Sequence, residues 1–350
     1  METLIGQQLG DYILEAELGR GSMGIVYRAR HARDGKTYAL KCLLDALASD
    51  MSFITRFTRE ARIIAGLHHP NIIQVYDAGR HRQYLYFVME YFPGQTAGQM
   101  LKERQRLPVG LVTEIVAQAA DALNYAHSQL RVVHRDIKPE NLLVDRWCRV
   151  KVLDFGLARV EGLESITRAG TVVGSLYYVS PEQLLGQQLD GRSDIYALGV
   201  SMYEMLTGVR PYRGQTLTDM SRAILAGAAT PPSTLEPSVT PELERIIRRA
   251  LARDLAQRYS TGAELYADLR AIQTAQAASP VELAPAPPSP PSPTVSGGPQ
   301  PQAQPRPQPL SPADRPRPAR SSRMTLRPTS LEPASPDQMV PRRTFPPSER

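Results

Sequence analysis

The stretch that most constrains this chain is the octapeptide HRDIKPEN, residues 134–141. A predicted amphipathic helix over residues 112–128 precedes it, and two short apolar strands over residues 142–144 and 150–153 follow it. The octapeptide is therefore a polar loop between buried elements. It brings a carboxylate, an ammonium group and a carboxamide close together in sequence: Asp136, Lys138 and Asn141.

Composition limits the possible classes of function. The 350 residues are 42% apolar, which is sufficient for a large folded domain, and the formal charge is +6. Beyond residue 275 there are nine arginines and five acidic residues, so most of the excess lies in a tail. We therefore expect no nucleic-acid partner. Cys42 and Cys148 are too few for a disulfide framework, and no signal peptide or long apolar run predicts a membrane segment. A cytoplasmic location is expected.

The chain divides into three regions by composition and periodicity. Residues 1–11 form an N-terminal extension, residues 12–272 a folded domain, and residues 273–350 a disordered tail rich in Pro, Arg and Ser. The folded domain subdivides at about residue 90, because strand patterns dominate before that point and helical patterns after it.

The first subdivision is predicted to be mostly strand with one helix. The helix covers residues 52–67 and ends at His69-Pro70-Asn71, because the residue before a proline avoids helical dihedrals. The expected strands lie on both sides of a glycine turn within residues 12–29 and over residues 37–43, 72–76 and 84–90.

The second subdivision is predicted to be mostly helical. Residues 194–206 are apolar nearly all round, which predicts a buried helix. Surface-type helices are expected over residues 217–226, 242–252 and 263–273, and Pro241 suits a first helical position after Thr240 as the cap.

A glycine-rich segment lies in the strand-rich part. Residues 19–24, GRGSMG, match the pattern G-x-G-x-x-G. In a dinucleotide-binding fold such glycines lie between a strand and a helix, whereas here strands are expected on both sides. The segment is therefore either an ordinary turn or a hairpin whose backbone amides approach phosphates closely.

Lys41 lies inside an apolar strand, in the sequence YALK. A buried ammonium group needs a carboxylate partner, and Glu60 lies on the helix predicted in this part. A Lys41–Glu60 pair is thus expected, with a solvated lysine at a strand edge as the alternative. Asp154-Phe155-Gly156 follows another apolar strand, 18 residues after Asp136.

The order of these motifs resembles the protein kinase family, and most closely the bacterial serine/threonine kinases of eukaryotic type. The resemblance rests on the glycine hairpin, Lys41, Glu60, the HRDIKPEN loop and Asp154-Phe155-Gly156, followed by Ser180-Pro181-Glu182 and Asp194, and covers roughly residues 10–272. It implies an α+β, bilobal protein kinase fold: a small β-rich N-lobe over residues 12–90, and a larger, mainly helical C-lobe over residues 91–272.

The resemblance implies the chemistry of the family, transfer of the γ-phosphoryl group of Mg-ATP to a protein hydroxyl. Asp136 would accept the hydroxyl proton, and Lys138 would neutralise charge on the transferred group. Lys41, paired with Glu60, would hold phosphates. Two metal ligands for Mg²⁺ are implied, Asn141 and Asp154.

Further roles are implied for residues around the nucleotide and in the scaffold. Glu182 would pair with Arg258, Asp194 would cap the backbone of the HRDIKPEN loop, and His134 and Phe155 would join a hydrophobic spine. The residues implied to surround ATP are Leu18, Gly19, Arg20, Gly21, Ser22, Met23, Gly24, Ile25, Val26, Ala39, Lys41, Met89, Glu90, Tyr91 and Leu143.

Regulation and acceptor type follow from the same resemblance. Arg135 implies a phosphorylated residue in the segment between Asp154 and Glu182, with Thr167 and Thr171 as the first candidates and Ser165 as the third. The sequence after Asp136, including Lys138, favours serine or threonine acceptors over tyrosine. Protein substrates are the implied partners, and self-association for autophosphorylation in trans is an option.

Two other functions remain open at this level. A pseudokinase would keep the fold without turnover, but it should lack at least one of Lys41, Asp136, Asn141 and Asp154, and all four are present. A docking platform would place the activity in the proline-rich tail, which could bind proline-reading domains.

Overall fold

The computed structural model describes residues 3–21, 24–43, 61, 63–82, 84–155 and 174–278, and for residues 174, 175 and 276–278 the backbone only. The chain divides into two units, Met1–Glu282 and Leu283–Arg350, and all the described residues belong to the first. Most of the predicted helix over 52–67 and most of the tail lie outside the described residues. No helix in these ranges is both long enough and apolar enough to cross a lipid bilayer.

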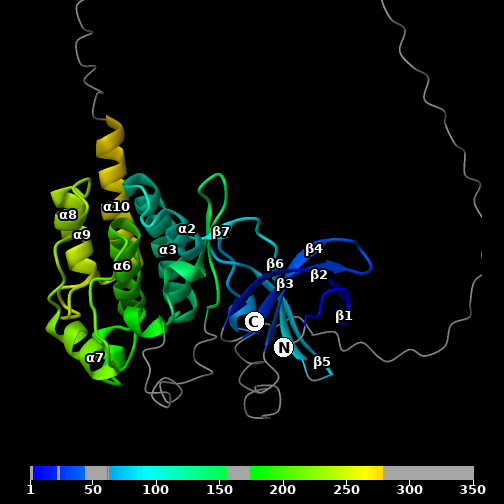
Figure 1. Ribbon diagram of the computed structural model, residues 1–350. Coiled ribbons are helices and arrows are strands. Elements are labelled where there is room, and N and C mark those ends of the chain that lie inside the picture. Colours follow the sequence, from blue (N-terminus) through cyan, green and yellow to red (C-terminus); the bar gives the residue numbers. More distant parts are fainter. Residues whose placement is uncertain are drawn as a thin grey trace, which may run out of the picture. The chain divides into compact units, whose positions relative to one another are not determined.

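The N-terminal part of the described chain forms a six-stranded sheet with the order β1-β2-β3-β4-β6-β5 (Figure 1), and every neighbouring pair is antiparallel. The strands are β1 (Gln8–Leu9), β2 (Tyr12–Gly21), β3 (Gly24–His31), β4 (Thr37–Leu43), β5 (Val75–His81) and β6 (Tyr84–Glu90).

The sheet is apolar on both faces, because side chains alternate along each strand. Leu40 and Cys42 of β4 belong to a small cluster on one face, together with Leu4 and Leu9. Ala39 and Leu43 face the other way, into the large cluster that continues through the helical part. The position of a side chain in β4 thus decides which of two cores it enters.

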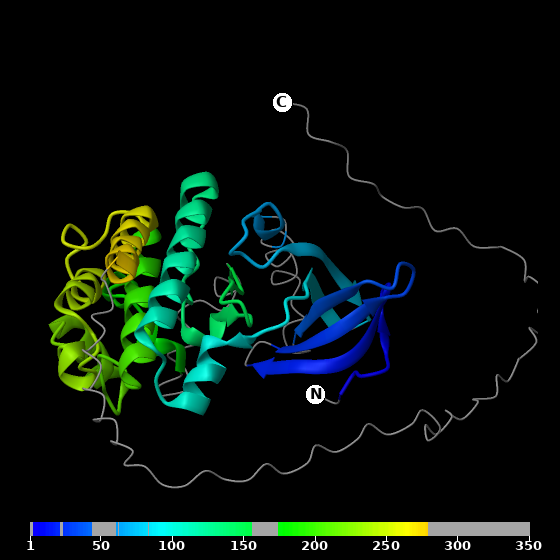
Figure 2. The same cartoon turned by 90° about the horizontal axis from the view of Figure 1, so that it is seen from above.

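The C-terminal part is built around two helices, α3 (Val109–Leu130) and α6 (Gly191–Thr207). It lies beside the sheet as a separate helical lobe (Figure 2). A three-stranded sheet with the order β7-β8-β9 joins it: β7 (Gln95–Thr96), β8 (Leu142–Val144) and β9 (Val150–Val152). The other elements are α2 (Ala97–Arg104), η2 (Pro139–Asn141), η4 (Gly174–Tyr178), α5 (Pro181–Leu184), α7 (Leu217–Ala226), α8 (Pro232–Leu235), α9 (Pro241–Ala250) and α10 (Gly262–Ala278).

Several helix predictions are confirmed. Every residue from Ser193 to Leu206 is buried, as the all-round apolar pattern of α6 predicts. Helix α9 begins at Pro241, and the Thr240 side chain accepts a hydrogen bond from the amide of Leu243. The bilobal α+β architecture expected from the sequence is therefore present.

The structure differs from the sequence predictions at two places. The strand expected over 72–76 lies instead at Val75–His81, because pairing with β6 selects the more polar edge segment. Ile72 makes only an isolated parallel bridge with Val152. The second place is helix α2, for which the sequence analysis made no prediction. It has little apolar periodicity and begins at a capping box formed by Thr96 and Gln99.

The structure adds detail at both proposed domain boundaries. Within residues 1–11, β1 pairs with β2, and Leu4 and Leu9 are almost fully buried. At the other end α10 continues to Ala278, beyond residue 272. Both terminal stretches therefore belong to the secondary structure of the first unit.

A buried ion pair fastens the lower part of the helical lobe. Arg258 Nη1 lies 2.7 Å from Glu182 Oε1, and the side chains are 0% and 3% exposed. The guanidinium also donates to the carbonyl of Arg192, and Ser193 Oγ donates to Glu182. Burial acts to raise the pKa of Glu182, but the hydrogen bonds and charge of Arg258 outweigh it, so the pKa is lowered. The implied Glu182–Arg258 pair is thus confirmed.

Replacing Arg258 with Met should lower the free energy of unfolding by about 3–5 kcal/mol, because Glu182 is left as an unpaired buried charge. The double variant E182L/R258M should recover a large part of this loss, since it removes both charges. Urea unfolding followed by circular dichroism measures both changes.

The matched control is Arg248→Met, which breaks the Arg248–Glu244 pair, where the arginine is 73% exposed. A surface pair contributes about 1 kcal/mol or less, so this variant should stay close to wild type. Because the pKa of Glu182 is lowered from its ordinary value of 4.5, its charged form stabilises the fold above pH 4.5. This stabilisation is lost as the pH falls through the lowered pKa. Equal losses for R258M and R248M would contradict the structural role of the buried pair.

Candidate active site

The HRDIKPEN loop brings three polar side chains into direct contact. Lys138 Nζ donates to Asp136 Oδ2 at 2.7 Å, and Asn141 Nδ2 donates to the same oxygen at 3.2 Å. Asn141 Nδ2 also donates to the backbone carbonyl of Asp136 at 2.7 Å. The Asp136 carboxylate is thus held by a cation and an amide from its own loop.

Asp194 anchors the loop from the first turn of the buried helix α6. Its two carboxylate oxygens accept from the amides of His134 and Arg135, at 2.7 and 2.8 Å. Burial raises the pKa of Asp194, although these amides and His134 oppose the shift. The backbone cap implied by the resemblance is therefore confirmed.

Arg135 takes a backbone conformation that is uncommon for a residue with a side chain. Its φ angle is +71°, in the left-handed region, which costs about 1–2 kcal/mol for a residue other than glycine. The contact with Asp194 and a hydrogen bond from Gln183 Nε2 to the Arg135 carbonyl hold this turn. Thr167, Thr171 and Ser165 lie outside the described residues, so their relation to Arg135 remains a prediction.

Lys41 and Asp154 meet across the boundary between the two lobes. Lys41 Nζ, from β4, lies 2.7 Å from Asp154 Oδ2, which follows β9. Burial acts to raise the pKa of Asp154, but the charge and hydrogen bond of Lys41 outweigh it and lower the pKa. Glu60, the partner expected for Lys41, is outside the described residues. Among those that are described, Asp154 is the carboxylate that pairs with Lys41.

Phe155, the residue after Asp154, packs against His134 of the HRDIKPEN loop. Its ring centroid lies 4.6 Å from that of His134, and Phe155 is 1% exposed. His134 Nε2 contacts the carbonyl of Leu153 at 2.6 Å and must donate there, which places the ring proton on Nε2. The ring contact agrees with the hydrophobic spine implied for these two residues.

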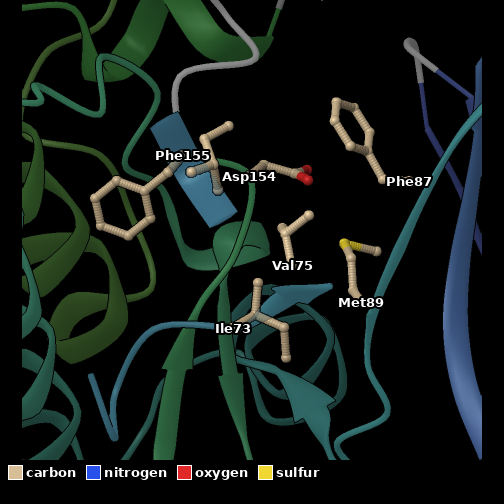
Figure 3. A pocket seen from close by; sticks show the side chains of 7 residues that line it. Ile73, Val75, Phe87, Met89, Asp154 and Phe155 are labelled. Carbon is tan, nitrogen blue, oxygen red and sulfur yellow. The ribbon is translucent and has the colours of Figure 1, made fainter. Parts of the chain in front are cut away.

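A small cavity lies between the two lobes behind Met89. Figure 3 shows Asp154 and Phe155 directed to opposite sides from adjacent positions, with Val75, Phe87 and Met89 across from them. The cavity measures about 10 Å³, which is about enough for one water molecule. The core behind Met89 is thus closely packed.

The glycine segment forms part of a hairpin, as expected. Gly19 pairs with Val26 and Gly21 with Gly24, so β2 and β3 continue on both sides of the turn. A Cβ atom on Gly24 would lie 2.1 Å from the carbonyl oxygen of Cys42, so only glycine fits there. Ser22 and Met23, at the tip, are outside the described residues.

The other residues expected around ATP lie on β2, β3, β4, β6 and β8 and directly after β6. Ala39 pairs with Met89, and Val26 pairs with Lys41, which places these four positions next to one another. The remaining members are Leu18, Arg20 and Ile25 of the hairpin, Glu90 at the end of β6, Tyr91 directly after it, and Leu143 of β8. Ile25 is fully buried in the small cluster on the opposite face, so its side chain is directed away from the others. Their contact with a nucleotide remains a prediction.

The donor set suits Mg²⁺, which prefers oxygen ligands and usually takes one or two carboxylates together with phosphates and water. Asp154 contributes a carboxylate. Asn141 directs its amide nitrogen at Asp136, so its carboxamide oxygen faces the other way. No group of three or more His, Cys, Asp or Glu side chains forms a metal cluster within the described ranges. The two proposed ligands therefore fit a metal that is also bound by phosphate.

Two supporting residues were missed in the sequence. Lys151 of β9 donates to Glu90 at 2.8 Å and to the carbonyl of Ile72, so it joins β9 to the end of β6 and to the segment before β5. A lysine within the apolar strand VKV was the available signal, as it was for Lys41. Gln183, which contacts Arg135, is the fourth residue of a capping box that begins at Ser180.

Replacing Asp194 with Asn should lower the free energy of unfolding by about 1–3 kcal/mol, because one buried backbone amide loses its acceptor. The amides of His134 and Arg135 should also lose protection, which hydrogen exchange measures directly. The control is Asp190→Asn at the start of the same helix, where Asp190 caps Arg192 and Asn caps equally well. Unchanged exchange at both amides in D194N would contradict the proposed anchoring.

Comparison with known proteins agrees with this geometry. The family model described as "Protein kinase domain" matches residues 12–268. The serine/threonine-protein kinase PknB of Mycolicibacterium smegmatis is 40% identical over 278 residues, covering 77% of this chain and 44% of that protein. PrkC of Bacillus subtilis, also a serine/threonine-protein kinase, is 37% identical over 268 residues, covering 76% and 41%.

A similar fold has been solved. The crystal structure of the Mycobacterium tuberculosis PknI kinase domain has a TM-score of 0.61 and 31% identity, covering 77% of this chain and 99% of that one. This chain spans less than half the length of PknB and PrkC. With a family model matched over most of its length and the catalytic-loop geometry described above, the chain belongs to the protein kinase family.

Proposed function

We propose that this protein is a serine/threonine protein kinase that transfers the γ-phosphoryl group of Mg-ATP to Ser or Thr hydroxyls of proteins. The observation that carries the proposal is the convergence of two contacts, Lys41 with Asp154 and Asp136 with Lys138 and Asn141. Relatives named serine/threonine-protein kinases support the acceptor type.

Asp136 acts on the acceptor. Its carboxylate orients the substrate hydroxyl and accepts its proton, the role of the loop aspartate in kinases. Lys138, in contact with Asp136, provides positive charge beside the group that is transferred. Because the transition state is loose, positioning and charge stabilisation account for most of the catalysis.

Lys41, Asn141 and Asp154 act on the nucleotide. Lys41 holds the α- and β-phosphates, while Asp154 and Asn141 supply the oxygen ligands of magnesium, which when bound neutralises phosphate charge. Lys41 is 6% exposed, so its ammonium group is shielded from water and its attraction to phosphate is stronger than on an open surface. Glu60 is proposed to orient it.

Regulation is proposed to act through Arg135. A phosphate on Thr167 or Thr171, added by the kinase itself, brings about two negative charges that pair with arginine and order the segment between Asp154 and Glu182. The bacterial relatives support a role in bacterial signalling. Protein substrates, self-association for this reaction and a cytoplasmic location complete the proposal, and two free cysteines agree with a reducing compartment.

The rival functions make different predictions. A pseudokinase should lack at least one of Lys41, Asp136, Asn141 and Asp154, and all four are present. A docking platform would place the function in the proline-rich tail, and phosphoryl transfer would then not be its main activity. The two experiments below separate the three functions.

Replacing Asp136 with Asn, or Lys41 with Met, should reduce phosphoryl transfer by about 10³-fold or more with little change in circular dichroism. Mass spectrometry after incubation with Mg-ATP measures the transfer and identifies the acceptor residues. Lys102→Met is the control, because Lys102 is exposed on α2. Turnover at the wild-type rate by D136N or K41M would contradict the roles proposed for Asp136 and Lys41.

Removing residues 279–350 should leave autophosphorylation within about twofold of the full chain, because every contact of the proposed site lies in the first unit. The cut follows Ala278, the last residue of α10. Mass spectrometry of both proteins under the same conditions is the measurement. Loss of transfer on truncation, with the fold intact, would instead favour a working role for the tail.

A further inference from the structure

A second, larger cavity opens in the helical lobe, away from Lys41 and Asp154. It measures about 340 Å³ and lies where η4 meets the end of α6 and the segment leading to α7. Two arginines and one glutamate are its charged lining residues. The residues that line it are Tyr177, Glu204, Gly208, Val209, Arg210, Tyr212, Arg213 and Gly214.

The Glu204 carboxylate is fully engaged within the protein. Its Oε1 accepts from Arg210 Nε at 3.0 Å, and its Oε2 accepts from the hydroxyl of Tyr178. Glu204 is 8% exposed. A basic ligand would have to displace Arg210 to reach this carboxylate, so the cavity is not suited to a lysine or arginine.

Arg210 is held rigidly in the wall. Its guanidinium carbon lies 3.9 Å from the centre of the Tyr177 ring, a cation–π contact, while Nε remains on Glu204. A guanidinium fixed by a ring and a carboxylate loses little entropy when it binds an additional acceptor. Its charge is already balanced by Glu204.

Arg213 supplies the unbalanced charge. It is exposed, and none of the carboxylates in the described part of the chain forms an ion pair with it. The nearby Asp219 is occupied by Thr216 and Arg222. The cavity as a whole therefore carries one net positive charge, which belongs to the exposed Arg213.

The cavity is connected to the proposed catalytic loop through a short stretch of chain. Tyr177 lies in η4, three residues before Ser180, which caps α5. Gln183 of α5 donates to the carbonyl of Arg135, the residue before Asp136. The wall containing Tyr177 thus belongs to the same stretch of chain that contacts the residue before Asp136.

From this arrangement we propose that the cavity binds an acidic side chain, Asp or Glu, located near the acceptor hydroxyl of a protein substrate. Arg213 provides the ion pair, and Arg210 on Tyr177 forms the wall beside it. This inference rests on the proposed kinase function and specifies its substrate class.

The test uses the full-length protein and three peptides that share one Ser acceptor. In one peptide the flanking residues are Ala, in the second Asp and Glu, and in the third Lys. Wild type should show a KM about fivefold to tenfold lower for the acidic peptide than for the Ala peptide, since charge-assisted hydrogen bonds of this kind are strong. The kcat values should agree.

Arg213→Ala should remove this difference in KM without changing kcat for the Ala peptide, and Arg213→Glu should reverse it in favour of the Lys peptide. The matched control is Arg248→Ala, an arginine on α9 that is 73% exposed and outside the cavity. Equal KM values for the three peptides in wild type, or an acidic preference that persists in R213E, would overturn the inference.

A binding measurement separates failure of this inference from failure of the proposed function. Fluorescence anisotropy of the labelled acidic peptide, without nucleotide, should show affinity that falls about fivefold to tenfold in R213E and is kept in R248A. The autophosphorylation measurement decides on the kinase proposal, while the anisotropy result decides on the cavity. Identical affinity for wild type and R213E rejects the acidic-ligand site.

Discussion

The arrangement of the site depends on one buried carboxylate. Asp194 accepts hydrogen bonds from the amides of two successive loop residues, His134 and Arg135. This contact holds Arg135 in a left-handed conformation and so determines the direction in which Asp136 leaves the turn. Because Asp194 lies on a helix that is buried all round, the loop is fixed to a fully buried part of the helical lobe.

Helix α6 links this anchor to the rest of the lobe. Near its start, Ser193 and the Arg192 carbonyl contact the buried Glu182–Arg258 pair. Near its end, Glu204 holds Tyr178 and Arg210 at the cavity for which we propose an acidic ligand. Helix α6 therefore contacts both the proposed catalytic loop and the cavity of the proposed substrate contact.

The strand-rich lobe reaches the site through charge and backbone pairing. Lys41 contacts Asp154 directly, and Lys151 joins β9 to Glu90. The amide of Ile73 donates to the carbonyl of Val152, and the amide of Val152 donates to the carbonyl of Asn71. These contacts bring the end of β9, and with it Asp154, under the sheet that carries Lys41.

The sequence by itself determined the class of fold, the buried helix α6 and the identity of the polar residues, because periodicity and motif order are local properties of the chain. It located the Glu182–Arg258 pair and the Asp194 cap only through resemblance to a family. Tertiary structure alone decided that β5 begins at Val75, that Lys41 meets Asp154, and that Glu204 is already occupied by Arg210 and Tyr178. Each of these depends on which distant segments pack together, and spacing along the chain carries no information about the partner of a buried charge.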